Sequence, residues 1–99
     1  MSALAGLTEL VQGYFHEDWV DDYSGPWDVV DEFIRDDPQL AADLPAEVNS
    51  ILQDNPSEEN LKQLLLYELH CGYYIEADGW TYRGWLLAVA DRVKQATAA

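Results

Sequence analysis

Apolar residues recur at helical spacing along most of this chain, and that periodicity limits the fold more than any other feature. Leu7, Leu10, Val11 and Tyr14 occupy positions i, i+3, i+4 and i+7, which lie on one side of a helix. Comparable stripes occur further along the chain, in residues 27–34, 48–52, 61–69 and 86–93. We therefore predict an all-α fold, a single compact bundle of about five helices.

Prolines divide the first half of the chain into segments. Gly25-Pro26 predicts a helix that begins at the proline, and Asp37-Pro38 predicts its end. A short segment, Gln39 to Asp43, should follow. Pro45 is then expected to be the first residue of the next helix, because a proline inside a helix removes a hydrogen bond.

Capping and turn residues mark the second half. Ser57 is expected to cap a helix that ends at Gly72, and Thr81 should cap the last helix. Residues 73–80 break the helical pattern, and Asp78-Gly79 is a turn signal. A short extended or hairpin excursion is therefore expected there.

Length and composition fit one domain that spans residues 1–99. A chain of 99 residues with 48% hydrophobic content can build one core but not two. Its single cysteine, Cys71, excludes an intramolecular disulfide and a cysteine-ligated zinc site. The sequence shows no signal-peptide pattern and no apolar run of about 18 residues. These features predict a cytoplasmic protein without a membrane span.

The acidic charge is concentrated at one end. Residues 1–60 hold fifteen of the nineteen carboxylates and one base, Arg35, whereas residues 61–99 hold four acids and four bases. The net charge of −14 therefore belongs to the first sixty residues. Such a surface disfavours direct binding to nucleic acid or anionic membrane, and it favours a protein partner with a basic surface. Solubility is the alternative explanation.

One histidine and four carboxylates cluster within residues 16–22 (His16, Glu17, Asp18, Asp21, Asp22). Their spacing lacks the pattern of a calcium-binding loop, and a zinc site would need a second nearby histidine or cysteine. We predict no metal and no cofactor here. His16 and Asp18 are instead expected to hydrogen-bond to backbone groups at the end of the first helix.

The residues needed for catalysis are missing from the pattern. Cys71 directly follows His70, so on a helix their side chains diverge. The serines lack a nucleophile-elbow context, and there is no phosphate-binding glycine loop. Cys71 is expected to be a small buried residue near a helix end. We predict that the chain is not an enzyme.

The aromatic residues divide into two groups. Trp27 and Trp85 lie on apolar helix sides and are predicted to be core residues. Six more aromatics lie next to loops (Trp19, Tyr23, Tyr73, Tyr74, Trp80, Tyr82). Loop aromatics beside carboxylates are typical of interface hot spots, but in a small domain they also cover the rim of the core. Both interpretations stay open.

Residues 14–19, Tyr-Phe-His-Glu-Asp-Trp, resemble the opening motif of a family of small immunity proteins. These proteins belong to bacterial contact-dependent growth inhibition (CDI) systems, and their usual motif is Y-F-H-Q-D-W. Glu17 therefore stands where the family has glutamine. The resemblance continues through Ser57-Glu58-Glu59, Tyr73-Tyr74 and the ending Gly79-Trp80…Trp85-Leu86. The structural motif residues that it points to are Tyr14, Phe15, His16, Trp19, Trp80 and Trp85.

The resemblance implies a mainly helical protein that binds and neutralises a toxin domain delivered by a neighbouring cell. Toxins of this kind are often nucleases and hence basic, which suits an acidic partner. We expect the chain to be monomeric before it binds the toxin. We select as toxin-binding candidates Glu17, Asp18, Asp21, Asp22, Tyr23, Asp28, Asp31, Glu32 and Asp36. An alternative function is an acidic DNA mimic or regulatory protein that binds a host nucleic-acid-binding protein.

Overall fold

Helices joined by short turns make up the fold. The computed structural model describes residues 4–16, 18–55 and 57–97. The α-helices of these ranges are α1 (Ala5–Thr8), α2 (Trp19–Asp22), α3 (Pro26–Asp36), α4 (Pro38–Asp54), α5 (Glu58–Lys62) and α6 (Tyr82–Thr97). Two π-helical segments, η1 (Glu9–Tyr14) and η2 (Gln63–Glu68), and one 3-10 helix, η3 (Ile75–Asp78), complete them. No strand occurs in the ranges just given, so the predicted all-α class is confirmed.

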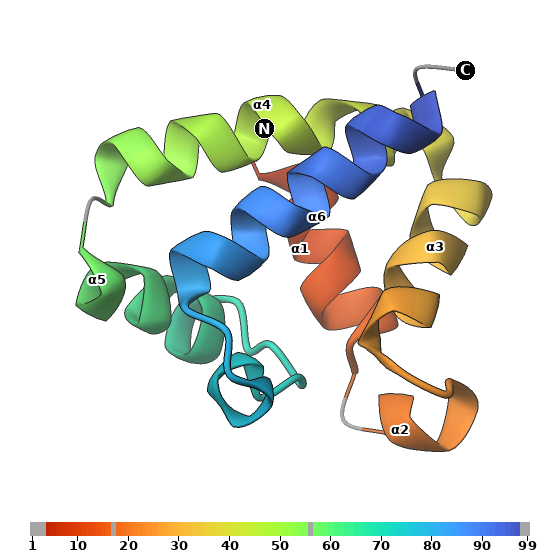
Figure 1. Ribbon diagram of the computed structural model, residues 1–99, viewed down its shortest axis with the longest axis horizontal. Helices are drawn as coiled ribbons and strands as arrows, with labels where there is room; N and C mark the ends of the chain where they lie inside the picture. The colour runs from red at the N-terminus through yellow and green to blue at the C-terminus, as the bar shows by residue number, and fades with distance from the viewer. Residues whose placement is uncertain (1–3, 17, 56, 98–99) are drawn as a thin grey trace.

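Helix α6 packs on elements from both halves of the chain. It crosses the front of the molecule in Figure 1 and contacts α3, α4, α5 and η3. Helix α1 lies behind it and packs on α4. The residues predicted to face inward from α6 are all buried (Leu86, Val89, Ala90, Val93).

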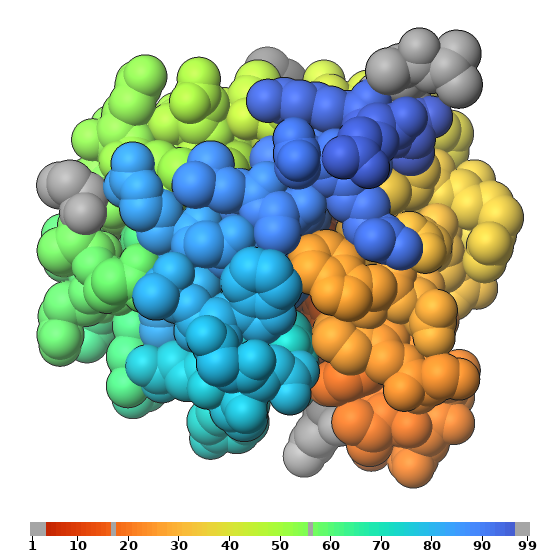
Figure 2. Space-filling model, in the orientation of Figure 1, coloured from red at the N-terminus to blue at the C-terminus, as the bar shows by residue number. Residues whose placement is uncertain are grey.

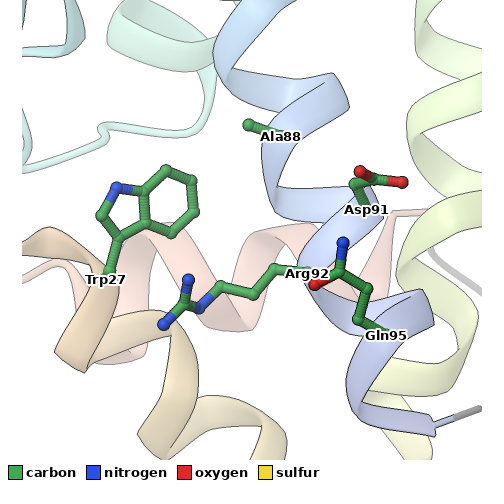
Figure 3. Close-up of a pocket in the computed structure, with 5 residues that line it drawn as sticks. All are labelled: Trp27, Ala88, Asp91, Arg92 and Gln95. Atoms are coloured by element: carbon green, nitrogen blue, oxygen red, sulfur yellow. The ribbon is translucent and has the colours of Figure 1, made fainter.

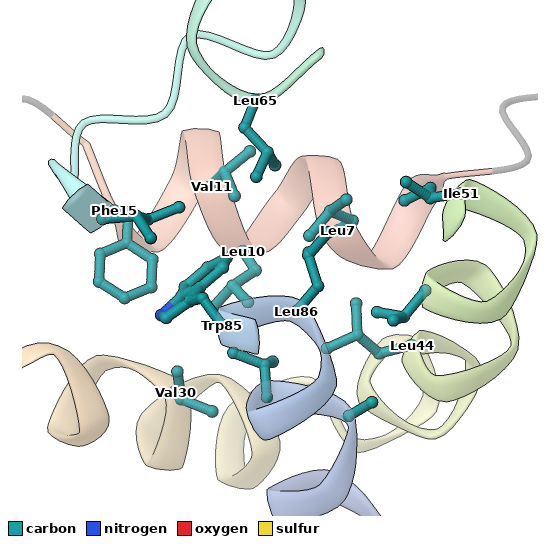
Figure 4. Close-up of a cluster of buried hydrophobic side chains, with 14 of the residues drawn as sticks. Leu7, Leu10, Val11, Phe15, Val30, Leu44, Ile51, Leu65, Trp85 and Leu86 are labelled. Atoms are coloured by element: carbon teal, nitrogen blue, oxygen red, sulfur yellow. The ribbon is translucent and has the colours of Figure 1, made fainter. Parts of the chain in front are cut away.

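An aromatic cluster fills the centre of the core. Trp85 is fully buried, and its ring centroid lies 5.8 Å from that of Phe15 and 5.9 Å from that of Tyr73. Figure 4 shows Trp85 of α6 facing α1, with Leu10 beside it and Val30 of α3 nearby. These rings come from segments that are far apart in the sequence. Large aromatic side chains bury the most area per residue, so the cluster contributes strongly to holding those segments together.

The first helix has the predicted inward face. Segments α1 and η1 are continuous, and Leu7, Leu10 and Val11 are buried. A Cβ atom at Gly6 would lie 2.6 Å from a backbone oxygen of α4 and 2.8 Å from the carboxylate of Glu47. The close approach of α1 to α4 therefore depends on glycine at this position.

The predicted break at Pro45 is wrong. Helix α3 ends at Asp36 and helix α4 begins at Pro38. Helix α4 then continues through Pro45 to Asp54. The inward side chains of α4 lie on both sides of the proline and are buried in one stripe (Ala41, Leu44, Val48, Ile51, Leu52). A proline inside a helix costs about 3 kcal/mol. Burying five apolar side chains on one continuous helix outweighs that cost.

The predicted helix end at Gly72 is also wrong. Segment η2 ends at Glu68, and His70 adopts a left-handed conformation with φ of 56°. Gly72 serves another purpose, because a Cβ atom there would lie 2.3 Å from the carbonyl oxygen of Phe15. Residues 73–80 form η3 and a turn at Gly79, whose φ is 85°, in place of an extended or hairpin excursion.

Side chains cap several helix starts. Ser57 Oγ accepts a hydrogen bond from the backbone N–H of Asn60, and Thr81 Oγ1 accepts one from Gly84, as predicted. Carboxylates from other helices add two caps that the sequence pattern did not predict. Glu47 accepts from the first backbone N–H groups of α1, and Glu58 accepts from those of α6. Part of the acidic charge therefore stabilises the fold.

Candidate functional site

The hexapeptide at residues 14–19 clamps the loop after the first helix to Gly72. The Gly72 N–H donates to the carbonyl oxygen of Phe15 at 3.0 Å, and Trp19 Nε1 donates to the carbonyl oxygen of Gly72 at 3.1 Å. Phe15 is fully buried and its ring contacts those of Trp19 and Tyr73. The motif thus fixes the backbone on which α2 begins.

The polar residues of the motif hold the loop from the other side. The Tyr14 hydroxyl donates to Asp37 Oδ2 at 2.6 Å, and burial together with this bond raises the pKa of Tyr14 far above its usual value. His16 Nδ1 accepts from the backbone N–H of Asp18 at 3.1 Å, so it bonds to the backbone before α2 and not to the predicted end of the first helix. Its Nε2 lies 3.3 Å from Asp22 Oδ2. The Asp18 side chain makes no capping hydrogen bond, and Glu17 lies outside the described residues.

Five of the toxin-binding candidates are exposed carboxylates. They are Asp18, Asp21, Asp22, Asp28 and Asp36, and we call them the acidic face. They come from the loop before α2, from α2 itself and from α3. Arg35 is the basic side chain of that stretch, and it too is exposed. The field of this part of the surface is therefore strongly negative.

Three other candidates, Tyr23, Asp31 and Glu32, have partners within the fold. Asp31 is half-buried, and Arg92 donates to it through Nε at 2.6 Å and Nη2 at 2.8 Å. This bidentate bond lowers the pKa of Asp31. A hydrogen bond to Glu32, together with burial, raises the pKa of Tyr23 to about 12. Asp31, Glu32 and Tyr23 thus border the acidic face and also help to hold the fold together.

Arg92 connects α6 to α3. Figure 3 shows its side chain extending from α6 toward Trp27, and the guanidinium carbon lies 5.2 Å from the centre of the Trp27 ring. A shallow pocket of about 200 Å³ lies beside this contact. Trp27 is half-buried and meets Trp80 edge-on, with ring centroids 6.0 Å apart. Two residues that line this pocket, Trp27 and Arg92, therefore already contact each other.

The loop aromatics divide between the two interpretations. Tyr73 and Tyr82 are buried and belong to the core, and Trp19 and Trp80 are half-buried against it. Tyr74, in contrast, is 72% exposed. Val20 is 63% exposed and is not among the predicted site residues. Both side chains line one groove, between α2 and the segment 72–78.

The arrangement carries little that could do chemistry. Burial raises the pKa of the Cys71 thiol to about 11, so it stays protonated at neutral pH and is a poor nucleophile. Within the ranges that the structure describes, no three histidine, cysteine or acidic side chains gather as a metal site would need. No helix in those ranges has the length and apolarity needed to cross a membrane. What this surface offers is charge and exposed apolar area.

Comparison with known proteins agrees with a role in binding. No curated protein and no solved structure matches this chain. Residues 3–93 match the CdiI immunity protein family. The match covers the hexapeptide clamp, the acidic face, the groove and the core aromatics. The chain belongs to the CdiI immunity protein family.

Proposed function

We propose that this immunity protein neutralises a basic nuclease domain of a CDI effector by covering it with the acidic face. The observation that carries the proposal is the exposure of Asp18, Asp21, Asp22, Asp28 and Asp36 on one stretch of chain. Glu17, Tyr23, Asp31 and Glu32 lie within the same stretch and extend the proposed contact. The protein acts in the cytoplasm, where the toxin domain would otherwise reach its substrate.

The physical basis is substitution of carboxylates for phosphates. A nuclease cleft is lined with lysine and arginine, because it must hold the nucleic-acid backbone. A row of carboxylates held on a helix can occupy that cleft in place of the substrate. Asp28 and Asp36 lie eight residues apart on α3, which places them about 12 Å apart along the helix axis.

Charge also sets the speed of binding. Complementary surfaces raise association rates toward ~10⁸–10⁹ M⁻¹s⁻¹ at low salt, whereas neutral surfaces associate at ~10⁵–10⁶ M⁻¹s⁻¹. A cell that receives a toxin needs rapid capture. An acidic face with little opposing charge therefore suits an inhibitor that must reach its target before the target reaches nucleic acid.

The test compares two variants of equal charge. One replaces Asp21, Asp28 and Asp36 with asparagine. The control replaces three exposed carboxylates of α4 and α5 with their amides, at Asp43, Asp54 and Glu59. Each variant has a net charge of −11 in place of −14. Any difference between them therefore reflects where the charge lies.

Association with the toxin domain encoded by the gene immediately upstream would be measured at low and high salt. We expect the first variant to associate roughly tenfold more slowly at low salt, and the control to stay much closer to the parent. Equal association rates for the two variants would show that the acidic face does not steer binding. Failure of the parent to bind that domain would reject the proposed partner and favour the regulatory alternative.

A further inference from the structure

A groove next to the acidic face has the features of an anchor site. It lies between α2 and the segment 72–78 and encloses about 290 Å³. Figure 2 shows these two parts of the chain as neighbouring lobes at the lower edge of the molecule, one orange and one teal. Trp19 and Tyr73 contribute to its lining, and Val20 and Tyr74 line it with largely exposed side chains.

Hydrogen bonds and a ring contact hold the two sides of the groove together. Both of its sides meet at Gly72, whose N–H and carbonyl oxygen are bonded to the Phe15 carbonyl and the Trp19 indole. The rings of Trp19 and Tyr73 also meet edge-on, with their centroids 5.5 Å apart. A partner that inserts here pays little ordering cost, and such preorganised pockets are where binding energy concentrates.

The charge around the groove is negative. Asp78 lines it, and its Oδ2 accepts from the Tyr73 hydroxyl at 2.5 Å. The Asp78 side chain is exposed, so its carboxylate is accessible to a partner. Asp21 and Asp18 flank α2 residues Val20 and Trp19 in the sequence, and both are exposed. None of the residues lining the groove is basic.

We propose that this groove binds one arginine side chain of the toxin domain. This inference rests on the proposed function and names the contact at its centre. The guanidinium is planar, stacks on aromatic rings and is weakly hydrated, so it suits Tyr74 better than an ammonium does. Its N–H groups pair with the Asp78 carboxylate, and its methylene groups pack on Val20.

Two exposed tyrosines provide a matched test. Tyr74→Ser removes the groove wall, whereas Tyr67→Ser removes a tyrosine that is 61% exposed on η2 and does not line the groove. We expect Tyr74→Ser to raise the Kd for the upstream-encoded toxin domain about 30-fold, mainly through faster dissociation, as truncating a hot-spot residue does. Tyr67→Ser should change the Kd less than about threefold. Val20→Ser supplies a second groove variant, and equal effects of Tyr74→Ser and Tyr67→Ser would overturn the proposal.

The identity of the bound side chain needs a double-mutant cycle. Asp78→Asn keeps an oxygen that can accept from Tyr73, so it removes charge without removing that bond. It is combined with alanine substitutions of each arginine and lysine on the toxin domain. We expect one arginine to show a coupling of at least about fivefold in Kd with Asp78→Asn. Coupling to a lysine, or to no basic residue, would overturn the arginine assignment.

The two proposals fail in different ways. If the asparagine variant of the acidic face binds like its control while Tyr74→Ser weakens binding, the acidic face is wrong and the groove stands. If the acidic-face variant slows association but Tyr74→Ser has no effect, the groove is wrong and the proposed function stands. If the parent does not bind the toxin domain, both are rejected.

Discussion

The carboxylate of Glu47 gives the sharpest test of how acidic residues stabilise this fold. Its side chain is 8% exposed, and it accepts from the backbone N–H of Gly6 at 3.1 Å and of Leu7 at 3.0 Å. Glu47→Gln retains one oxygen but places an NH₂ group against the other backbone N–H. The substitution also removes negative charge from a helix start.

The expected loss follows from these two effects. A hydrogen bond to a charged group contributes about 1.5–3 kcal/mol, and the helix-end interaction adds about 0.3–1 kcal/mol. Glu47→Gln should therefore lower the free energy of unfolding by about 2–4 kcal/mol. Typical domains have only about 5–15 kcal/mol in total, so the change is large.

Urea unfolding followed by tryptophan fluorescence would measure the change. Glu68→Gln is the control, because Glu68 is exposed and the substitution makes the net charge −13 as well. The control should stay within about 0.5 kcal/mol of the parent. A Glu47→Gln protein that unfolds at the same urea concentration as the control, with the same m-value, would refute the capping role.

Two further predictions concern the contacts that hold the site together. Asp31→Asn should lower stability at pH 7 by about 1 kcal/mol, since the pair with Arg92 is partly exposed and screened. Because the folded state lowers the pKa of Asp31 from 3.8, this contribution is complete above that value and is lost as the pH falls below it. Urea titrations should therefore show the gap between parent and variant closing as the pH falls below the unfolded value of 3.8. Gly72→Ala should lower the free energy of unfolding by about 2–3 kcal/mol, because the new Cβ would lie 2.3 Å from the Phe15 carbonyl oxygen. Thermal or urea unfolding would measure the loss. Gly13→Ala is the control, because its Cβ would meet only a flexible glutamate side chain, and this variant should be as stable as the parent or more stable.

The helices could be predicted from the sequence because their apolar stripes are local. The one large error, at Pro45, arose from giving a local rule more weight than a longer pattern. Ala41, Leu44, Val48 and Ile51 keep helical spacing across the proline, and that spacing was visible in the sequence. Tertiary burial decided the outcome, as it often does where propensity and packing conflict.

The role of Gly72 could not be read from the sequence. A glycine after a leucine-rich helix predicts a left-handed end, but it also permits close approach of another backbone. Here His70 takes the left-handed conformation and Gly72 admits the Phe15 carbonyl. Phe15 lies more than fifty residues before Gly72 in the sequence, so no local pattern distinguishes the two uses of the glycine.

The charge of the candidate site could be predicted from the sequence, but the exposure of its individual side chains could not. Asp31 and Asp28 are both acids on a two-faced helix, yet Asp31 pairs with Arg92, 61 residues away, and Asp28 is exposed. The groove is likewise assembled from residues 19–20 and 72–78. Sequence spacing reports which residues share a helix face, but it does not report what that face meets.

The acidic half of the chain thus holds carboxylates in two settings, one hydrogen-bonded to backbone N–H groups at helix starts and one on the exposed acidic face. Glu47 and Glu58 are held against backbone N–H groups, where low mobility and defined geometry make them stabilising. Asp21, Asp28 and Asp36 are exposed, where a long-range field matters more than geometry. Neutralising the first kind should therefore change stability and leave the association rate intact, and neutralising the second should do the reverse.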